Sequence, residues 1–299
     1  MTLRTAFTTL AEYNAAKAND LEKALLQSGT LPISASALLA HLQGTPRLKF
    51  NFEKAHALHP DVPIQFAEAL FILMGQDGQQ IPSVDVLRAL KTLGSDKERL
   101  DSRFRFYMGM SAADEFFRTH PNHSHMSINI PADAVASRFF LPKLTEAVDL
   151  FRAAHPGKGL ILEMLEDKSW DKQTHGKAMA DIAKLGVGWA VDDYGAYNGH
   201  HTINSLRLVK RYAGDMPPIV KIDGHLLERS LNSGKMIPVI ATLQNVQKHC
   251  PEALLVFEWI KNDGQIAVLQ TAMDNAGLSK LSIDYVQGKH FRQAQPCVL

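Results

Sequence analysis

The sequence predicts an α/β fold whose mainly parallel sheet closes into a modified (β/α)₈ barrel. After Pro46, short apolar segments alternate with longer amphipathic segments, the pattern of strands alternating with helices. Several of the short segments end on an acidic or amide side chain. These polar positions succeed one another at intervals of roughly 30 residues, the length of one βα unit.

The first expected elements are two helices that precede the barrel. Leu10, Tyr13, Leu21 and Leu25 recur at helical spacing, and Gly29 and Pro32 then break the pattern. A second short helix, capped by Ser34 or Ser36, is expected to run to Leu42. About 45 residues make a poor core alone. We therefore expect residues 1–46 to be a helical extension packed on the main domain, which spans residues 47–299.

Eight strands and their helices are expected in that domain. The strand segments are 47–52, 63–70, 125–131, 159–166, 186–195, 218–224, 253–260 and 281–288. Apolar residues three and four apart predict helices at 142–155 and 236–249. An open, doubly wound sheet would also place a site at its strand ends. Only a barrel brings groups from so many strands to one point.

Composition limits the function classes. The chain has 299 residues, 32 Lys+Arg and 31 Asp+Glu, for a net charge of +1, which gives no electrostatic case for binding DNA, RNA or a membrane surface. No apolar run reaches the roughly 18 residues that span a bilayer, and no signal peptide is recognised. Two cysteines are too few for a disulfide framework. We expect a protein of the reducing cytoplasm.

The polar strand ends predict a metal site. In a barrel they meet at the mouth, and they comprise Glu68, Asn129, Glu163, Asp192, Asp193 and Glu258. Carboxylates crowded together repel one another unless cations or protons offset their charge. Oxygen ligands favour Mg²⁺, Mn²⁺ or Ca²⁺ over zinc. Two such ions, with Asp193 or its neighbour bridging, would suit hydrolysis of a phosphate ester, and Lys221 could orient the attacking water.

Each residue also has a structural interpretation. A single acid at a strand end is commonly a helix cap or a solvated loop residue. Lys221 could serve a salt bridge, for instance to Asp223. Glu163 and Glu258 argue for function because apolar residues flank both, and such charges are costly unless paired or metal-bound. The histidine pairs 123/125 and 200/201 lack the helical HExxH context of a zinc site and indicate loops.

Seven motifs in order resemble those of EAL domains, the cyclic di-GMP (c-di-GMP) phosphodiesterases. They begin with FAEAL at 66–70 and continue with SINIP, LEMLE, LGVGWAVDDYG, IVKID, VFEWI and YVQGKHF. The resemblance covers about residue 47 to the C-terminus. It implies a barrel whose first strand runs antiparallel to the others. It also implies hydrolysis of c-di-GMP to linear pGpG with two Mg²⁺ or Mn²⁺ ions.

The resemblance also implies a role for each matching residue. The matching metal ligands are Glu68, Asn129, Glu163, Asp192, Asp193 and Glu258. Lys221 would hold the nucleophilic water, and Glu166 would steady the loop after the paired aspartates. Lys221, Glu68, Asp193 and Glu166 are thus the expected catalytic residues. Gln287 and Asp223 are expected on the substrate-binding side.

The chain departs from the family at residues that bind the substrate or lie near it. The arginine that usually follows EAL by two residues, and grips a phosphate, is Ile72 here. The family's EGVE corresponds to residues 258–261, so its second glutamate is Lys261. The loop at 194–205, which couples metal occupancy to homodimerisation in the family, is also altered. No segment resembles a sensory domain, so regulatory input would come from the N-terminal helices or a protein partner.

Three hypotheses follow. The matched ligands and Lys221 favour an active c-di-GMP phosphodiesterase. Ile72, Lys261 and the altered loop favour a degenerate domain that binds c-di-GMP or a protein without turnover. The third hypothesis is an unrelated metal-dependent barrel hydrolase acting on another phosphate ester, which the order and spacing of the motifs disfavour.

Overall fold

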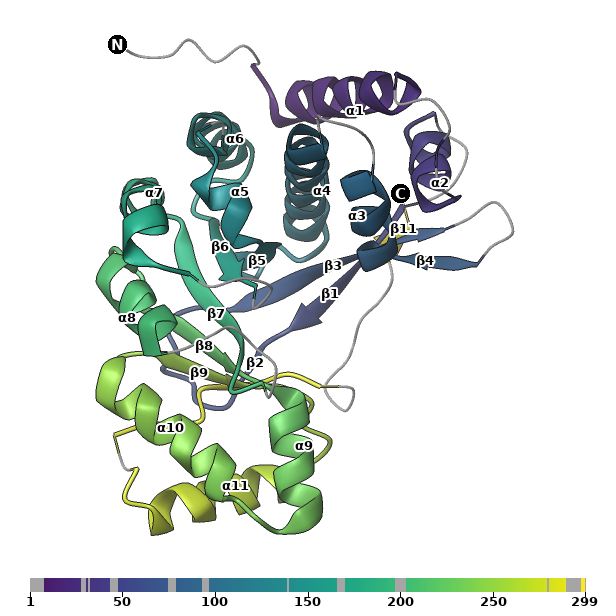
Figure 1. Cartoon of the computed structure of the whole chain (residues 1–299). Coiled ribbons are helices and arrows are strands. Elements are labelled where there is room, and N and C mark those ends of the chain that lie inside the picture. Colours follow the sequence, from purple (N-terminus) through teal and green to yellow (C-terminus); the bar gives the residue numbers. More distant parts are fainter. Residues whose placement is uncertain are drawn as a thin grey trace.

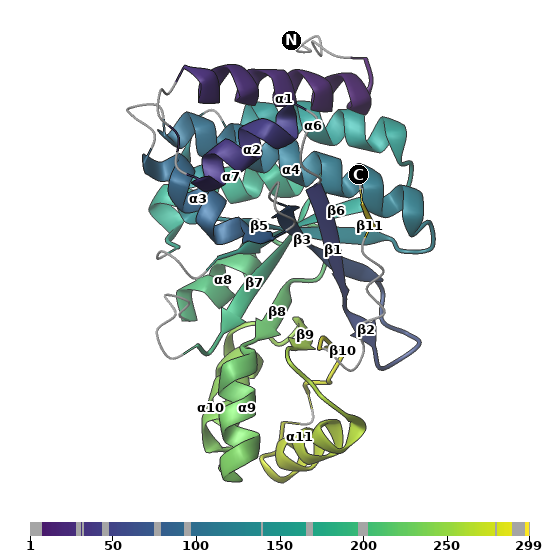
Figure 2. The same cartoon turned by 90° about the vertical axis from the view of Figure 1, so that its right-hand side faces the viewer.

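A closed barrel of strands with helices around it forms the centre of the molecule (Figures 1 and 2), here a computed structural model. The structure describes residues 8–27, 31, 33–43, 48–74, 79–92, 97–138, 140–165, 170–196, 203–278, 280–288 and 297–298. Among them the strands are β1 (Leu48–Lys54), β2 (His56–Ala57), β3 (Phe66–Met74), β4 (Gln80–Pro82), β5 (His125–Ile130), β6 (Gly159–Met164), β7 (Gly188–Tyr194), β8 (Ile219–Ile222), β9 (Leu254–Phe257), β10 (Tyr285–Val286) and β11 (Cys297–Val298). The eight expected strand segments are all confirmed.

Helices follow most of the strands. They are α1 (Leu10–Leu26), α2 (Ile33–Leu42), α3 (Ser83–Thr92), α4 (Lys97–Thr119), α5 (Ala132–Ala136), α6 (Phe140–Ala154), α7 (Lys172–Lys184), α8 (Ile203–Tyr212), α9 (Gly224–Ser233), α10 (Ile237–His249) and α11 (Asp263–Asn275). The helices expected at 142–155 and 236–249 correspond to α6 and α10. None of the described helices is both long and apolar enough to cross a membrane.

The barrel closes through its first strand. Strands β3, β5, β6, β7, β8, β9 and β10 pair in that order as parallel neighbours. β1 pairs antiparallel with β3, and β2, which directly follows β1, pairs antiparallel with β10. One nearly continuous strand therefore bridges the two sides of the parallel sheet. The expected barrel with one antiparallel strand is confirmed.

A small apolar cluster fills the barrel's interior. It comprises Ala55, Ile64, Phe66, Ile161, Ala190, Ile219, Val256 and Tyr285. The Phe66 and Tyr285 rings meet edge to face with centroids 5.2 Å apart, and the Tyr285 hydroxyl donates to the carbonyl of Ile64 at 2.6 Å. This packing fills the part of the barrel that precedes the strand ends, and the polar residues at the C-terminal strand ends lie beyond it.

The two N-terminal helices lie mainly on the outer helices (Figure 1), with α1 on α4 and α6 and α2 on α3, and α2 also contacts β3. α1 begins with a capping box, in which the Thr9 side chain accepts from the Glu12 amide while Glu12 accepts from the Thr9 amide. Tyr13, Leu21 and Leu25 on α1 are fully buried, where α1 packs against α4 and α6. This packing supports the proposal that residues 1–46 extend the main domain.

Candidate functional site

The candidate site forms the layer directly above the apolar cluster. Side chains two residues apart on a strand share a face, so each inward apolar residue is followed by an inward polar one. Phe66 precedes Glu68 in this way, and Ile161 precedes Glu163. The same step leads from Ala190 to Asp192, from Ile219 to Lys221, from Val256 to Glu258 and from Tyr285 to Gln287. The strand period therefore places six polar side chains in one ring.

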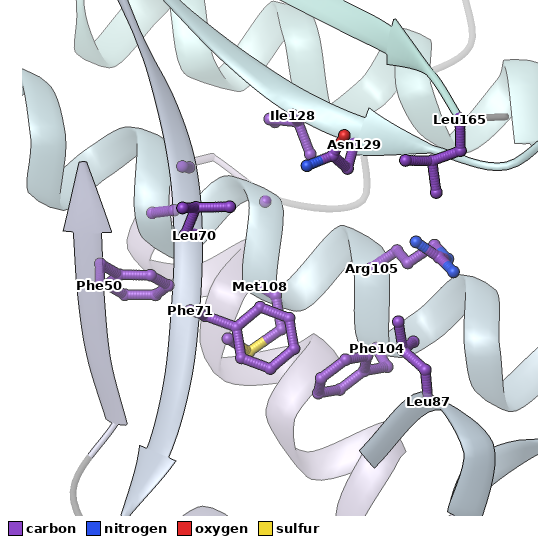
Figure 3. Close-up of a pocket in the computed structure, with 13 residues that line it drawn as sticks. Phe50, Leu70, Phe71, Leu87, Phe104, Arg105, Met108, Ile128, Asn129 and Leu165 are labelled. Carbon is purple, nitrogen blue, oxygen red and sulfur yellow. The ribbon is translucent and has the colours of Figure 1, made fainter. Parts of the chain in front are cut away.

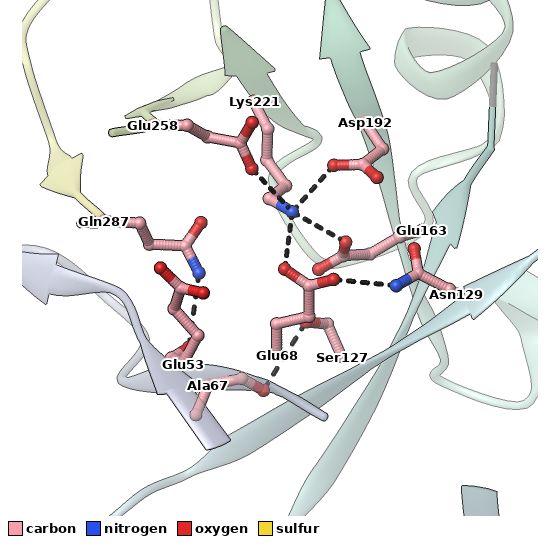
Figure 4. A network of polar contacts seen from close by, with 10 residues as sticks. All are labelled: Glu53, Ala67, Glu68, Ser127, Asn129, Glu163, Asp192, Lys221, Glu258 and Gln287. Atoms are coloured by element: carbon pink, nitrogen blue, oxygen red, sulfur yellow. Dashed lines mark hydrogen bonds and ion pairs between the residues drawn. The ribbon is translucent and has the colours of Figure 1, made fainter. Parts of the chain in front are cut away.

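Lys221 lies at the centre of this ring (Figure 4). Its Nζ lies 2.8 Å from Glu68 Oε2 and 2.9 Å from Glu163 Oε2. The same atom lies 2.7 Å from Asp192 Oδ1 and 3.0 Å from Glu258 Oε1. Three acids from strands β3, β6 and β7, and Glu258 directly after β9, thus converge on one ammonium whose side chain is 1% exposed. The structure thus brings together four of the acids that the sequence analysis singled out, around the lysine that it also singled out.

Two amides flank the acids. Asn129 Nδ2 donates to Glu68 Oε1 at 2.7 Å, and Gln287 Nε2 donates to the carbonyl of Glu53 at 3.2 Å. The remaining oxygens, Asn129 Oδ1 and Gln287 Oε1, are buried without a hydrogen-bond partner among the described residues. Glu163 Oε1 is likewise buried without a hydrogen-bond partner among the described residues. Burying an oxygen without a hydrogen-bond partner costs free energy of folding. A cation or a hydrogen-bond donor that binds here would recover this cost.

Asp193 joins the ring through an irregularity in β7. Adjacent residues of a regular strand point to opposite faces. The pairing of β7 with β8 shifts register between Val191 and Tyr194, and Asp193 has a positive φ of 46°. Such a φ is uncommon outside glycine, although aspartate tolerates it better than most residues. Asp192, Asp193 and Glu258 consequently have carboxylate oxygens within 4.8 Å of one another.

The electrostatics of the ring favour bound cations or protons. Burial, together with repulsion from Glu68, raises the pKa of Glu163 to about 8. Burial also raises the pKa of Glu68 and Glu258. For Lys221, burial opposes the charge, but Asp192, Glu163 and the other acids outweigh it and raise the pKa well above the ordinary value. One ammonium therefore does not neutralise the acids fully.

The donor set fits hard divalent cations. Glu68, Glu163 and Asp192 offer oxygens within 4.8 Å of one another, and Asp192, Asp193 and Glu258 form a second such group. All the donors are oxygens, which suits Mg²⁺, Mn²⁺ or Ca²⁺. Because Asp192 belongs to both groups, the two candidate cation positions are adjacent. The five acids expected as ligands make up these two groups, and the sixth expected ligand, Asn129, has an Oδ1 atom without a hydrogen-bond partner among the described residues.

Other expected site residues have different surroundings. Asp223 is the N-cap of α9, and its Oδ1 accepts from the Leu226 amide at 2.6 Å, so the salt bridge to Lys221 considered from the sequence does not form. Lys261 pairs with Glu228 on α9. Ile72 lies in the outer part of β3, between Lys49 of β1 and Pro82 of β4. Glu166 and residues 197–202 of the altered loop lie outside the described residues.

A cavity that the sequence does not reveal adjoins the ring. β3 pairs with β5 only from Phe66 to Glu68, and then diverges to pair with β4. A cavity of about 270 Å³ lies beside this gap, against α4 (Figure 3). Its wall includes Phe71 and Phe104, whose rings meet edge to face, and Arg105. Asn129 belongs to both the cavity wall and the acidic ring. The cavity therefore extends the site from the acidic ring, past Asn129, toward α4.

Comparison with known proteins identifies the family. The profile of the EAL domain matches residues 64–294, which include every residue of the ring. The chain belongs to the EAL-domain family. A search of curated protein sequences finds no match.

Solved EAL domains share the fold at low sequence identity. The EAL domain of FimX from Pseudomonas aeruginosa, bound to c-di-GMP, superposes with a TM-score of 0.62 at 16% identity, covering 89% of this chain and 96% of that one. An EAL protein from Listeria monocytogenes gives 0.60 at 19% identity, covering 83% and 89%. The phosphodiesterase PaMucR in complex with c-di-GMP gives 0.59 at 18% identity, covering 84% and 97%. These similarities establish the barrel fold.

Proposed function

We propose that this EAL domain is a metal-dependent phosphodiesterase that hydrolyses c-di-GMP to linear pGpG. The observation that carries the proposal is the ring in which Glu68, Glu163, Asp192 and Glu258 surround Lys221 at 2.7–3.0 Å. A structural role does not account for it, because burying several acids around one lysine is expensive. Membership of the EAL family, and the c-di-GMP complexes of FimX and PaMucR, support the choice of substrate.

The acids and Asn129 would hold two divalent cations. Glu68, Glu163 and Asp192 form one donor group, and Asp192, Asp193 and Glu258 form the other. When bound, such ions lower the pKa of a coordinated water and offset the charge on the phosphate oxygens. With the acids engaged in this way, the Lys221 ammonium remains in the ring as a hydrogen-bond donor. It would orient the attacking water and stabilise negative charge that develops on the phosphate.

A c-di-GMP receptor without turnover is the second candidate. Ile72 favours it, because no cation at position 72 is available to neutralise a phosphate. Loss of one charged hydrogen bond costs roughly 1.5–3 kcal/mol. Lys261 also favours it, because a positive charge stands near Glu258 where the family has a glutamate. The ion pair of Lys261 with Glu228 offsets part of that charge. The acidic ring itself is complete, and for this reason we rank the enzyme first.

The test is incubation of the purified protein with c-di-GMP and either Mg²⁺ or Mn²⁺, followed by chromatography for pGpG. EDTA should abolish product formation. Glu68→Ala should abolish it as well while circular dichroism shows an intact fold. A Glu68→Ala variant as active as the parent would overturn the assigned site. Calorimetry on the same samples identifies a receptor, which would bind c-di-GMP and release no product.

A further inference from the structure

Trp259 has a backbone conformation that tryptophan rarely adopts. Its φ is 58°, in the left-handed region that favours glycine. The EGVE motif that the chain resembles has glycine at this position. A bulky residue there costs conformational free energy and persists only where the surroundings hold it. Such outliers concentrate at ligand-binding positions, so the side chain's location decides what the strain serves.

Contacts from α9 hold the indole ring in one place. A Cβ added to Gly224 would lie 2.3 Å from Trp259 Cγ, so the ring rests directly on the bare backbone of Gly224. The His225 ring meets it edge-on with centroids 4.1 Å apart. The Lys261–Glu228 ion pair joins the same two segments. These contacts fix the ring against the start of α9.

The ring lies at the mouth of the barrel. Gly224 and His225 follow the C-terminal end of β8, and Trp259 follows that of β9, the strand next to it. The adjacent residue, Glu258, has its Oε1 3.0 Å from Lys221 Nζ. Trp259 nevertheless remains 43% exposed. An aromatic surface therefore stands beside the acidic ring and is open to solvent.

We propose that Trp259 is a stacking platform for one purine base of a nucleotide bound at the ring. This inference rests on the proposed function and adds a recognition element to it. An aromatic ring offers a flat apolar face on which any base can stack. If the phosphate of a nucleotide lies at the acidic ring, the base of that nucleotide can reach the neighbouring Trp259 ring at the mouth of the barrel. Stacking there would supply affinity independently of the cation missing at position 72.

The chain provides its own optical probe. Of its three tryptophans, Trp170 and Trp189 are buried, at 2% and 1% exposure. Fluorescence that a soluble quencher such as acrylamide reduces therefore reports on Trp259. c-di-GMP added to the parent should quench this emission and protect it from acrylamide. The quenching is recorded on mixing, before product accumulates.

Three variants complete the test. Trp259→Gly removes the ring and accepts the positive φ, so the protein should stay folded by circular dichroism. Its Kd and KM for c-di-GMP should rise about tenfold, as for loss of one base–aromatic stack. Trp259→Phe should keep most of the affinity without the fluorescence response. Ile237→Ala, which truncates an exposed apolar side chain on α10, should match the parent.

The outcomes separate the two proposals. If the parent binds c-di-GMP and Trp259→Gly binds it equally well, the platform is refuted while the proposed function stands. If the parent neither binds nor hydrolyses c-di-GMP, the proposed function and the platform fail together. A Trp259→Phe variant as weak as Trp259→Gly would show that the indole acts by packing and not by stacking, which also overturns the platform.

Discussion

The ammonium of Lys221 lies 2.7 Å from a carboxylate oxygen of Asp192, in a ring where three further acids contact the same nitrogen. Lysine and acids are buried together, so the lysine contributes to folding as well as to the proposed chemistry. Removing one partner of a buried ion pair leaves uncompensated charge. Divalent cations would supply compensating charge from outside the chain.

Lys221→Met should therefore lower the free energy of unfolding in EDTA by about 3–5 kcal/mol. Mg²⁺ or Mn²⁺ should restore part of this loss, because a ligand that binds only the native state stabilises it. Urea denaturation with and without metal measures both effects. The control is Lys210→Met, which removes a half-exposed pair with Glu252 at 3.4 Å and should cost at most about 1 kcal/mol. Equal stability of the parent and Lys221→Met in EDTA would contradict the interpretation.

Ile72→Arg should lower the KM for c-di-GMP. Position 72 lies four residues beyond Glu68 on the same face of β3, about 13 Å along the strand. A guanidinium there could form a charged hydrogen bond with a phosphate, worth roughly 1.5–3 kcal/mol, or about tenfold to a hundredfold in KM. Steady-state kinetics compare it with Ile72→Leu, which preserves the apolar character. An unchanged or higher KM for the arginine variant would reject this explanation of the weakened grip.

Leu21→Ala should destabilise the whole domain by about 2–5 kcal/mol. Leu21 is fully buried on α1, which packs on α4 and α6. If residues 1–46 extend the main domain, thermal unfolding should remain a single transition at a lower temperature. Leu26→Ala, on the same helix at 56% exposure, should change little. A separate early transition in the Leu21→Ala variant would instead identify an independent module.

Acid should destabilise the protein through His123. Burial, with repulsion from Lys54, lowers the pKa of His123 to about 4, and its ring meets that of Phe116 edge-on at 5.2 Å. In the unfolded chain His123 binds a proton near pH 6.5, whereas in the folded protein it stays neutral until about pH 4. Stability should be full above pH 6.5 and fall as the pH drops toward 4.

His123→Gln should flatten that pH dependence. The measurement is the urea midpoint at several pH values between 4 and 7. His59→Gln replaces an exposed histidine and should leave the slope unchanged. If His123→Gln retains the parent's slope, the source of acid sensitivity lies elsewhere, for example in the neighbouring His120, whose pKa burial also lowers.

The sequence alone determined the strands and the polar residues at their ends. Alternation with a period of two is a local property, because adjacent side chains of a strand face opposite sides. The expectation from the sequence was that polar side chains at successive strand ends, Glu163 and Lys221 among them, meet at the mouth of a barrel. In the structure these two side chains lie 2.9 Å apart. The order of the seven motifs along the sequence was enough to recognise the EAL family.

Only the tertiary structure decided how those residues interact. The four contacts of Lys221 depend on closure of the barrel by β1 and β2, which brings together strands distant in the sequence. Residue type alone does not predict the left-handed conformations of Asp193 and Trp259, because even aspartate adopts a positive φ in only a minority of cases. Long-range packing imposes both, whereas the cap that Asp223 forms on α9 is a local contact with the Leu226 amide. Strand period sets which face a side chain takes, whereas closure sets the distances on which the chemistry depends.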